Sequence, residues 1–384
     1  MDLERARNAL RRLHLPAWLF YGFAEANPLA LEALDLSGRH LTRRFAYLLP
    51  ARGEPRLLVH RLEEERFDHL PGRRIRYTRW QEFDEGLARL LEGTGRVALD
   101  YQPGGSIPYL SRVDAGFLEK VRALGVETVS AAEPMLYLQT WSQADLASHR
   151  RAAVVLHEAR DAALAFLRSR LPGSPPRELE VQQVMLRVFE ERGVECDHPP
   201  IVAFGANAAR PHYAPLPGGD AELKRGDVVL LDLWAREPGG VYADITWMAG
   251  WEADRQALEA WRAVAAARDA AVELVRRAYA ESRHPAGWEA DRAARRVLEE
   301  SGYGLYVLHR TGHNLGRTGP HGSGTHLDDY ESHDTRPLIP GLAFTVEPGV
   351  YLPGRFGVRS EIDVYLHEPG PEVTTELQGE IDVL

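Results

Sequence analysis

Leu231 to Thr246 read LDLWAREPGGVYADIT, and two of these letters are acids in apolar surroundings. Asp232 follows an apolar run at 228–231, and Asp244 stands between short apolar or β-branched pairs. Pro-Gly-Gly at 238–240 is a turn signal, so the stretch predicts a β-hairpin with one carboxylate on each strand. Burying a carboxylate without a partner is costly. The hairpin therefore predicts a positive partner, either a basic side chain or a metal ion.

Three later clusters carry more side chains with metal-binding chemistry. His313 lies in HRTGHNLG at 309–316, and His321 follows eight residues later in GPHG. Glu347 and Glu361 each stand in a short run of β-strand character. Four carboxylates and a histidine, all at positions where a lone acid is unfavourable, predict a shared metal site.

The order Asp, Asp, His, Glu, Glu in these contexts resembles the pita-bread metallopeptidases, the superfamily of methionine aminopeptidase, aminopeptidase P and prolidase. Glu-Pro-Gly-x-Tyr, Arg-x-Glu, Thr-Gly-His-x-x-Gly and a Pro-His-Tyr at 211–213 are similar to the proline-specific branch. The resemblance implies an α/β (α+β) protein with two domains. Residues 1–138 would form a creatinase-like α/β domain. Residues 139–384 would form a pita-bread catalytic domain, a curved antiparallel sheet flanked by helices.

The resemblance also implies the active-site roles. Two divalent metal ions would be held by five ligands: Asp232, Asp244, His313, Glu347 and Glu361. Mn²⁺ is expected first because oxygen ligands dominate, with Co²⁺ and Zn²⁺ as alternatives. The expected catalytic residues are a general base, an oxyanion donor, a histidine near the scissile bond and a tyrosine on a proton path: Glu347, His321, His212 and Tyr351.

The two aspartates and the two histidines are each separated by one residue more than is usual in this family. The extra residue between the aspartates fits in the Pro-Gly-Gly turn. For the second histidine, His321 is preferred, and His326 and His333 stay open as alternatives.

Proline after the scissile bond removes the amide N–H and fixes the backbone, so specialised peptidases exist for such bonds. A dipeptide substrate also has a free carboxylate next to the proline, which a planar guanidinium binds well. The expected substrate-binding residues are His212, Arg336, Arg359 and His333. An ordinary salt bridge with Asp334 is the alternative role for Arg336.

The composition and net charge limit the classes of partner and the cellular location that we expect. A net charge of −10 argues against nucleic acid, and the basic runs at 5–12 and 73–79 read as solvated faces. We see neither a secretory leader nor a membrane span, and a lone cysteine, Cys196, fits a reducing cytoplasm. Relatives imply a homodimer.

The prediction is hydrolysis of Xaa-Pro dipeptides, with aminopeptidase P activity on longer peptides as the close alternative. A non-catalytic binding protein and a metal-free amidinohydrolase of the creatinase kind are disfavoured, because all five ligand positions are filled.

Overall fold

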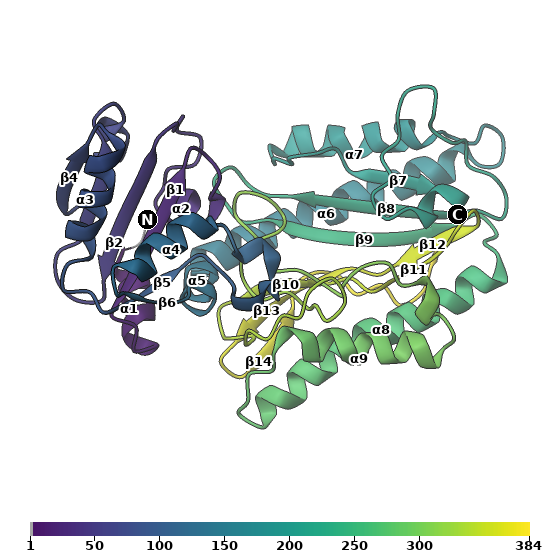
Figure 1. Ribbon diagram of the computed structural model, residues 1–384. Coiled ribbons are helices and arrows are strands. Elements are labelled where there is room, and N and C mark those ends of the chain that lie inside the picture. Colours follow the sequence, from purple (N-terminus) through teal and green to yellow (C-terminus); the bar gives the residue numbers. More distant parts are fainter. Residues whose placement is uncertain (1–2) are drawn as a thin grey trace. The chain divides into compact units, whose positions relative to one another are not determined.

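The computed structural model describes residues 3–384 (Figure 1). The chain divides into two compact units, 1–138 and 139–384. Among residues 3–384 no helix combines the length and the apolar character that crossing a bilayer requires.

The first unit is built on a six-stranded mixed sheet with the order β4-β3-β2-β1-β5-β6. Its strands are β1 (Ala17–Phe23), β2 (Arg44–Pro50), β3 (Arg56–His60), β4 (Arg73–Tyr77), β5 (Arg96–Leu99) and β6 (Glu127–Ser130). Its α-helices are α1 (Leu3–Arg12), α2 (Pro28–Ala33), α3 (Trp80–Leu91) and α4 (Ala115–Ala123), and α5 (Ala132–Gln139) ends it. Short 3₁₀ turns are η1 (Glu64–Phe67), η2 (Pro103–Gly105) and η3 (Pro108–Leu110).

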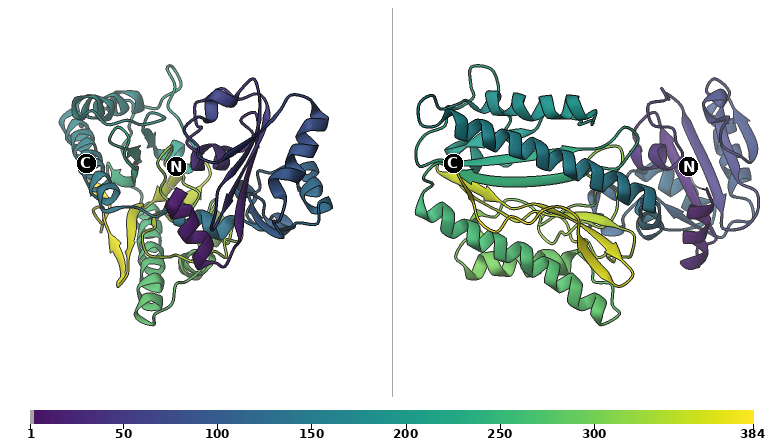
Figure 2. Two further views of the ribbon diagram at one scale, coloured as in Figure 1. Left: turned by 90° about the vertical axis from the view of Figure 1, so that its left-hand side faces the viewer. Right: turned by 180° about the vertical axis from the view of Figure 1, so that it is seen from behind.

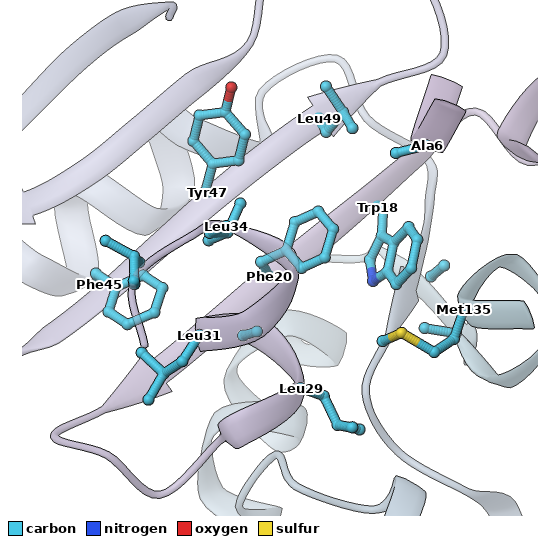
Figure 3. Packing of buried hydrophobic residues seen from close by; sticks show 14 of the residues in the cluster. Ala6, Trp18, Phe20, Leu29, Leu31, Leu34, Phe45, Tyr47, Leu49 and Met135 are labelled. Atoms are coloured by element: carbon cyan, nitrogen blue, oxygen red, sulfur yellow. The ribbon is translucent and has the colours of Figure 1, made fainter. Parts of the chain in front are cut away.

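The side chains of β1 alternate between the two faces of this sheet and pack into an apolar cluster on each face. Trp18 and Phe20 point into one apolar cluster, where their rings stack at 4.5 Å (Figure 3). Leu19 and Tyr21 belong to the cluster on the opposite face. Successive residues of a strand face opposite sides, so a strand apolar at every position lies between two packed layers.

The second unit contains three small sheets. One has the order β15-β9-β8-β7, with β7 (Ile201–Phe204), β8 (Val228–Ala235), β9 (Ala243–Gly250) and β15 (Asp382–Val383). The next has the order β10-β13-β14, with β10 (Ala343–Val346), β13 (Ile362–His367) and β14 (Gly370–Val373). β11 (Gly349–Leu352) pairs with β12 (Phe356–Arg359). All pairs are antiparallel except β15 with β9, and a bridge between Thr246 and Glu361 connects β9 to the start of β13.

Two helix pairs flank these sheets. α6 (Gln143–Arg170) runs along β8 and β9 beside α7 (Glu178–Arg192), as Figure 2 shows. α8 (Arg255–Ala280) packs on α9 (Gly287–Glu300) and contacts β10 to β12 and β14. Two 3₁₀ turns, η4 (Gly205–Ala209) and η5 (Gly304–Tyr306), complete the unit. This is the mixed, helix-flanked architecture that the sequence predicted.

Local signals explain where these elements start and stop. The Ser142 hydroxyl accepts the Asp145 N–H at 3.2 Å, and the Asp145 carboxylate accepts the Ser142 N–H at 2.7 Å, so a capping box begins α6. The predicted hairpin is also confirmed: Asp232 lies opposite Thr246, and Asp244 opposite Trp234.

Candidate metal centre and active site

The β8–β9 hairpin presents its two acids on one face. Asp232 is paired across the strands with Thr246, and Asp244 lies two residues before Thr246 on β9. Cross-strand partners share a face, as do residues two apart on one strand. Glu361 joins this face through its bridge to Thr246, whose hydroxyl donates to a Glu361 carboxylate oxygen at 2.7 Å.

His313 and Glu347 reach the same place from the chain segments beside β10. The His313 backbone N–H donates to the Thr345 hydroxyl at 3.0 Å, which fixes the histidine segment along β10. The His313 Nε2 lies 3.6 Å from an Asp244 oxygen and 3.5 Å from a Glu347 oxygen. One ligand atom each from Asp244, His313 and Glu361 lie within 4.8 Å of one another.

Asp244 and Glu361 are buried, the Glu347 side chain beside them is 13% exposed, and the pKa values of these groups reflect the crowding. Burial raises the pKa of Glu347 to about 7. Burial, followed by the charges of Glu361 and Asp232, raises the pKa of Asp244 well above its usual range. Burial lowers the pKa of His313, which keeps its imidazole neutral. A neutral imidazole and clustered carboxylates that repel one another are a donor set that fits divalent ions.

A buried arginine supplies positive charge at one end of the cluster. The Arg359 guanidinium makes a short contact with Asp232, and its Nε donates to the Thr246 hydroxyl at 2.8 Å. Arg359 was expected to contact substrate. The structure places it on the cavity wall, where its guanidinium holds Asp232.

The cluster opens on a cavity of about 800 Å³. All five predicted metal ligands line it, together with the predicted residues His212, His321 and Arg359. The sequence reasoning missed other lining side chains, among them Trp234, His309, Arg310 and Glu331. His309 and Arg310 directly precede the Thr-Gly-His motif, and that adjacency was the available signal.

The histidine alternatives differ in position. The His321 ring lies 3.9 Å from the His313 ring, centroid to centroid, and lines the cavity. Burial and then the charge of Arg310 lower the pKa of His321 to about 4. The His326 Nδ1 instead accepts the Asn314 N–H at 2.8 Å, outside the cavity lining. This geometry favours His321.

His333 and Arg336, both expected to bind substrate, lie away from the cavity lining. The His333 Nδ1 is 2.6 Å from an Asp329 oxygen. Arg336 is 3% exposed, donates through Nε and Nη2 to Asp334 at 2.9 and 2.7 Å, and donates to the carbonyls of residues 323 and 324. Its guanidinium is therefore bound to its own loop, and the salt bridge with Asp334 that was the alternative role for Arg336 is present.

The two remaining predicted residues differ in exposure. His212 is an exposed residue of the cavity wall, and the Tyr351 hydroxyl is buried 2.7 Å from the His309 Nε2. The loop that carries His212 is anchored by Glu178. The Glu178 carboxylate, wholly buried, accepts hydrogen bonds from the backbone N–H groups of residues 204 and 221, from Asn207 and from the Tyr213 hydroxyl.

Residues 147–368 match the model of metallopeptidase family M24. The chain belongs to this family. Among M24-type relatives, the probable dipeptidase PepE of Mycobacterium bovis is 29% identical over 336 residues, which cover 85% of this chain and 82% of that protein. The crystal structure of dipeptidase PepE from Mycobacterium ulcerans has 26% identity and a TM-score of 0.73, covering 99% of this chain and 96% of that one. An Xaa-Pro dipeptidase from Bacillus anthracis, at 22% identity and TM-score 0.65, covers 100% and 99% and shows the same fold.

Proposed function

We propose that this M24 peptidase hydrolyses dipeptides with proline after the scissile bond, using two divalent metal ions. The observation that carries the proposal is the convergence of four carboxylates and a neutral histidine on one cavity. Asp232, Asp244, His313, Glu347 and Glu361 would hold the ions, Mn²⁺ before Co²⁺ or Zn²⁺. When bound, such ions supply the positive charge that activates water and stabilises developing negative charge.

Residues of the cluster and around it would transfer the proton, stabilise the oxyanion and orient the peptide. Glu347 is a cavity-lining carboxyl whose position suits it to accept the proton of the attacking water and pass it to the leaving nitrogen. His321 is neutral at pH 7, because its pKa is lowered to about 4, so it can donate one N–H to the carbonyl oxygen as negative charge develops. His212 would orient the peptide, and Tyr351 would act through His309.

Two considerations favour a dipeptidase over an aminopeptidase that takes longer peptides. PepE of Mycobacterium bovis and of Mycobacterium ulcerans are named dipeptidases. The cavity wall also carries Arg310, a cation beyond the metal cluster that a free carboxylate could reach. A cytoplasmic location and a homodimer remain part of the proposal.

The test is hydrolysis of Ala-Pro, Ala-Pro-Ala and Ala-Ala by metal-stripped protein refilled with Mn²⁺, with products identified by mass spectrometry. We expect Ala-Pro to be cleaved fastest. Preferred cleavage of Ala-Pro-Ala would favour the aminopeptidase P activity, and preferred cleavage of Ala-Ala would remove the proline selectivity. Failure to cleave any of the three with every metal would contradict the proposal.

A further inference from the structure

A carboxylate next to the metal cluster is completely buried and is not one of the predicted ligands. Asp363 lies on β13, two residues after Glu361, and its side chain has no exposed surface. The Asp244 backbone N–H donates to its Oδ2 at 2.9 Å. Its Oδ1 has no hydrogen-bond partner in the part of the chain that the structure describes. Asp363 does not line the cavity, so it contacts a predicted ligand from outside the cavity.

The basic side chain beside this carboxylate is uncharged. Among residues 3–384, His149 is the one basic residue within ion-pair distance, with its Nε2 3.8 Å from the Asp363 Oδ2. The His149 Nδ1 lies 3.0 Å from the Tyr242 carbonyl oxygen, which can only accept, so Nδ1 carries the proton. Nε2 is then an acceptor, and the Thr374 hydroxyl lies 2.7 Å from it. Burial also lowers the pKa of His149 to about 4, which keeps the ring neutral at pH 7.

A buried carboxylate without a cation is unfavourable, and positive charge brought close to it relieves the cost. Divalent ions held by the predicted cluster would supply that charge, because Asp244 is one of their ligands and Asp363 is hydrogen-bonded to its main chain. Groups that hydrogen-bond to metal ligands from outside commonly change metal affinity about 10- to 100-fold. The buried charge of Asp363 and its bond to Asp244 therefore both favour metal binding.

We propose that Asp363 is a positioning residue of the metal centre: it fixes the Asp244 main chain and adds a negative charge that strengthens the binding of divalent ions. The inference rests on the metal centre of the proposed function. In the metal-free protein the same charge is uncompensated. Removing it should therefore weaken metal binding and at the same time stabilise the metal-free fold.

The experiment uses Asp363→Asn, which removes the charge and keeps an oxygen that can accept the Asp244 N–H. At pH 7 we expect the Kd for Mn²⁺, measured by calorimetry on chelator-treated protein, to rise about 10- to 100-fold. The urea midpoint of the metal-free protein should rise as well. A purely structural role would lower that midpoint instead.

Asp100→Asn is the matched control. Asp100 is a carboxylate of the first unit, 2% exposed, and it accepts hydrogen bonds from two neutral donors, the Asn27 amide and the Trp18 indole. It does not line the cavity. The Kd for Mn²⁺ should therefore be the same in Asp100→Asn as in the wild-type protein.

A second variant, Asp363→Ser, covers the case in which Asp363→Asn fails to fold. Its hydroxyl can also accept the Asp244 N–H and carries no charge, so the Kd for Mn²⁺ should rise by a similar factor. An unchanged Kd in either variant, a lower urea midpoint of metal-free Asp363→Asn, or failure of both variants to fold would overturn the inference. Absence of Mn²⁺ binding by the wild-type protein would overturn the proposed metal centre itself, so the two failures are distinguishable.

Discussion

Glu347→Gln is expected to inactivate the peptidase and, at the same time, to stabilise its metal-free form. Glu347 is largely buried beside other acids, and this burial raises its pKa to about 7 from a usual 4.5. At about 1.4 kcal/mol for each tenfold change in the dissociation constant, this corresponds to about 3 kcal/mol of folding free energy. Glutamine keeps the shape of the side chain and removes the charge.

The direction in which stability changes with pH follows from proton binding to Glu347. Between pH 4.5 and 7 the folded protein holds a proton on Glu347 that the unfolded chain releases, so the stability of the metal-free protein falls as pH rises. The destabilisation is absent below pH 4.5 and complete above pH 7. Glu347→Gln should therefore add up to about 3 kcal/mol at pH 8 and little at pH 4.5.

The assay is urea unfolding of chelator-treated protein at both pH values. Glu191→Gln, at an exposed position late in α7, is the matched control and should change the free energy of unfolding at neither pH. Destabilisation by Glu347→Gln of the same size at pH 4.5 and pH 8 would refute the reasoning, because a lost packing or hydrogen-bond contribution does not depend on this proton.

Three further substitutions test single parts of the site. Glu178→Gln replaces an acceptor oxygen that faces N–H and O–H donors, so we expect a loss of about 1–3 kcal/mol in stability. Because Glu178 anchors the loop that carries His212, the KM should also rise several-fold. An unchanged KM would contradict the anchoring role. Arg336→Met leaves Asp334 buried without its cation and should lower the free energy of unfolding in urea by about 3–5 kcal/mol. The kcat/KM of the folded protein should be unchanged. A rise in KM without a loss of stability would instead support a substrate role for Arg336. His321→Asn should lower kcat for Ala-Pro about 100-fold with an unaltered circular dichroism spectrum, and full activity would exclude it as the oxyanion donor.

The hairpin and its acids could be predicted because each signal is local. An acid inside a strand pattern is unusual, and Pro-Gly-Gly between two such strands marks the turn. β4 was missed: Arg73–Tyr77 was interpreted as a solvated basic run, although its arginines alternate with Ile75 and Tyr77, whose buried side chains face the core.

Positions that depend on a loop path were beyond sequence reasoning. His321, His326 and His333 share one glycine-rich segment, and its composition does not say which ring faces His313. The bridge between Leu315 and His321 folds the segment back, and this fold brings the His321 ring next to His313. The position of Arg310 on the cavity wall could not be predicted for a similar reason, because tertiary packing sets the orientation of its side chain.

Metal binding tests the central claim most directly. We would titrate chelator-treated protein with Mn²⁺ in a calorimeter and follow Ala-Pro hydrolysis in the same samples, with Asp244→Asn in parallel. We expect about two ions per chain, with activity returning as they bind, and at most one ion and no turnover in a folded Asp244→Asn protein. Full hydrolysis by metal-free protein, or unchanged metal binding and activity in Asp244→Asn, would contradict the account.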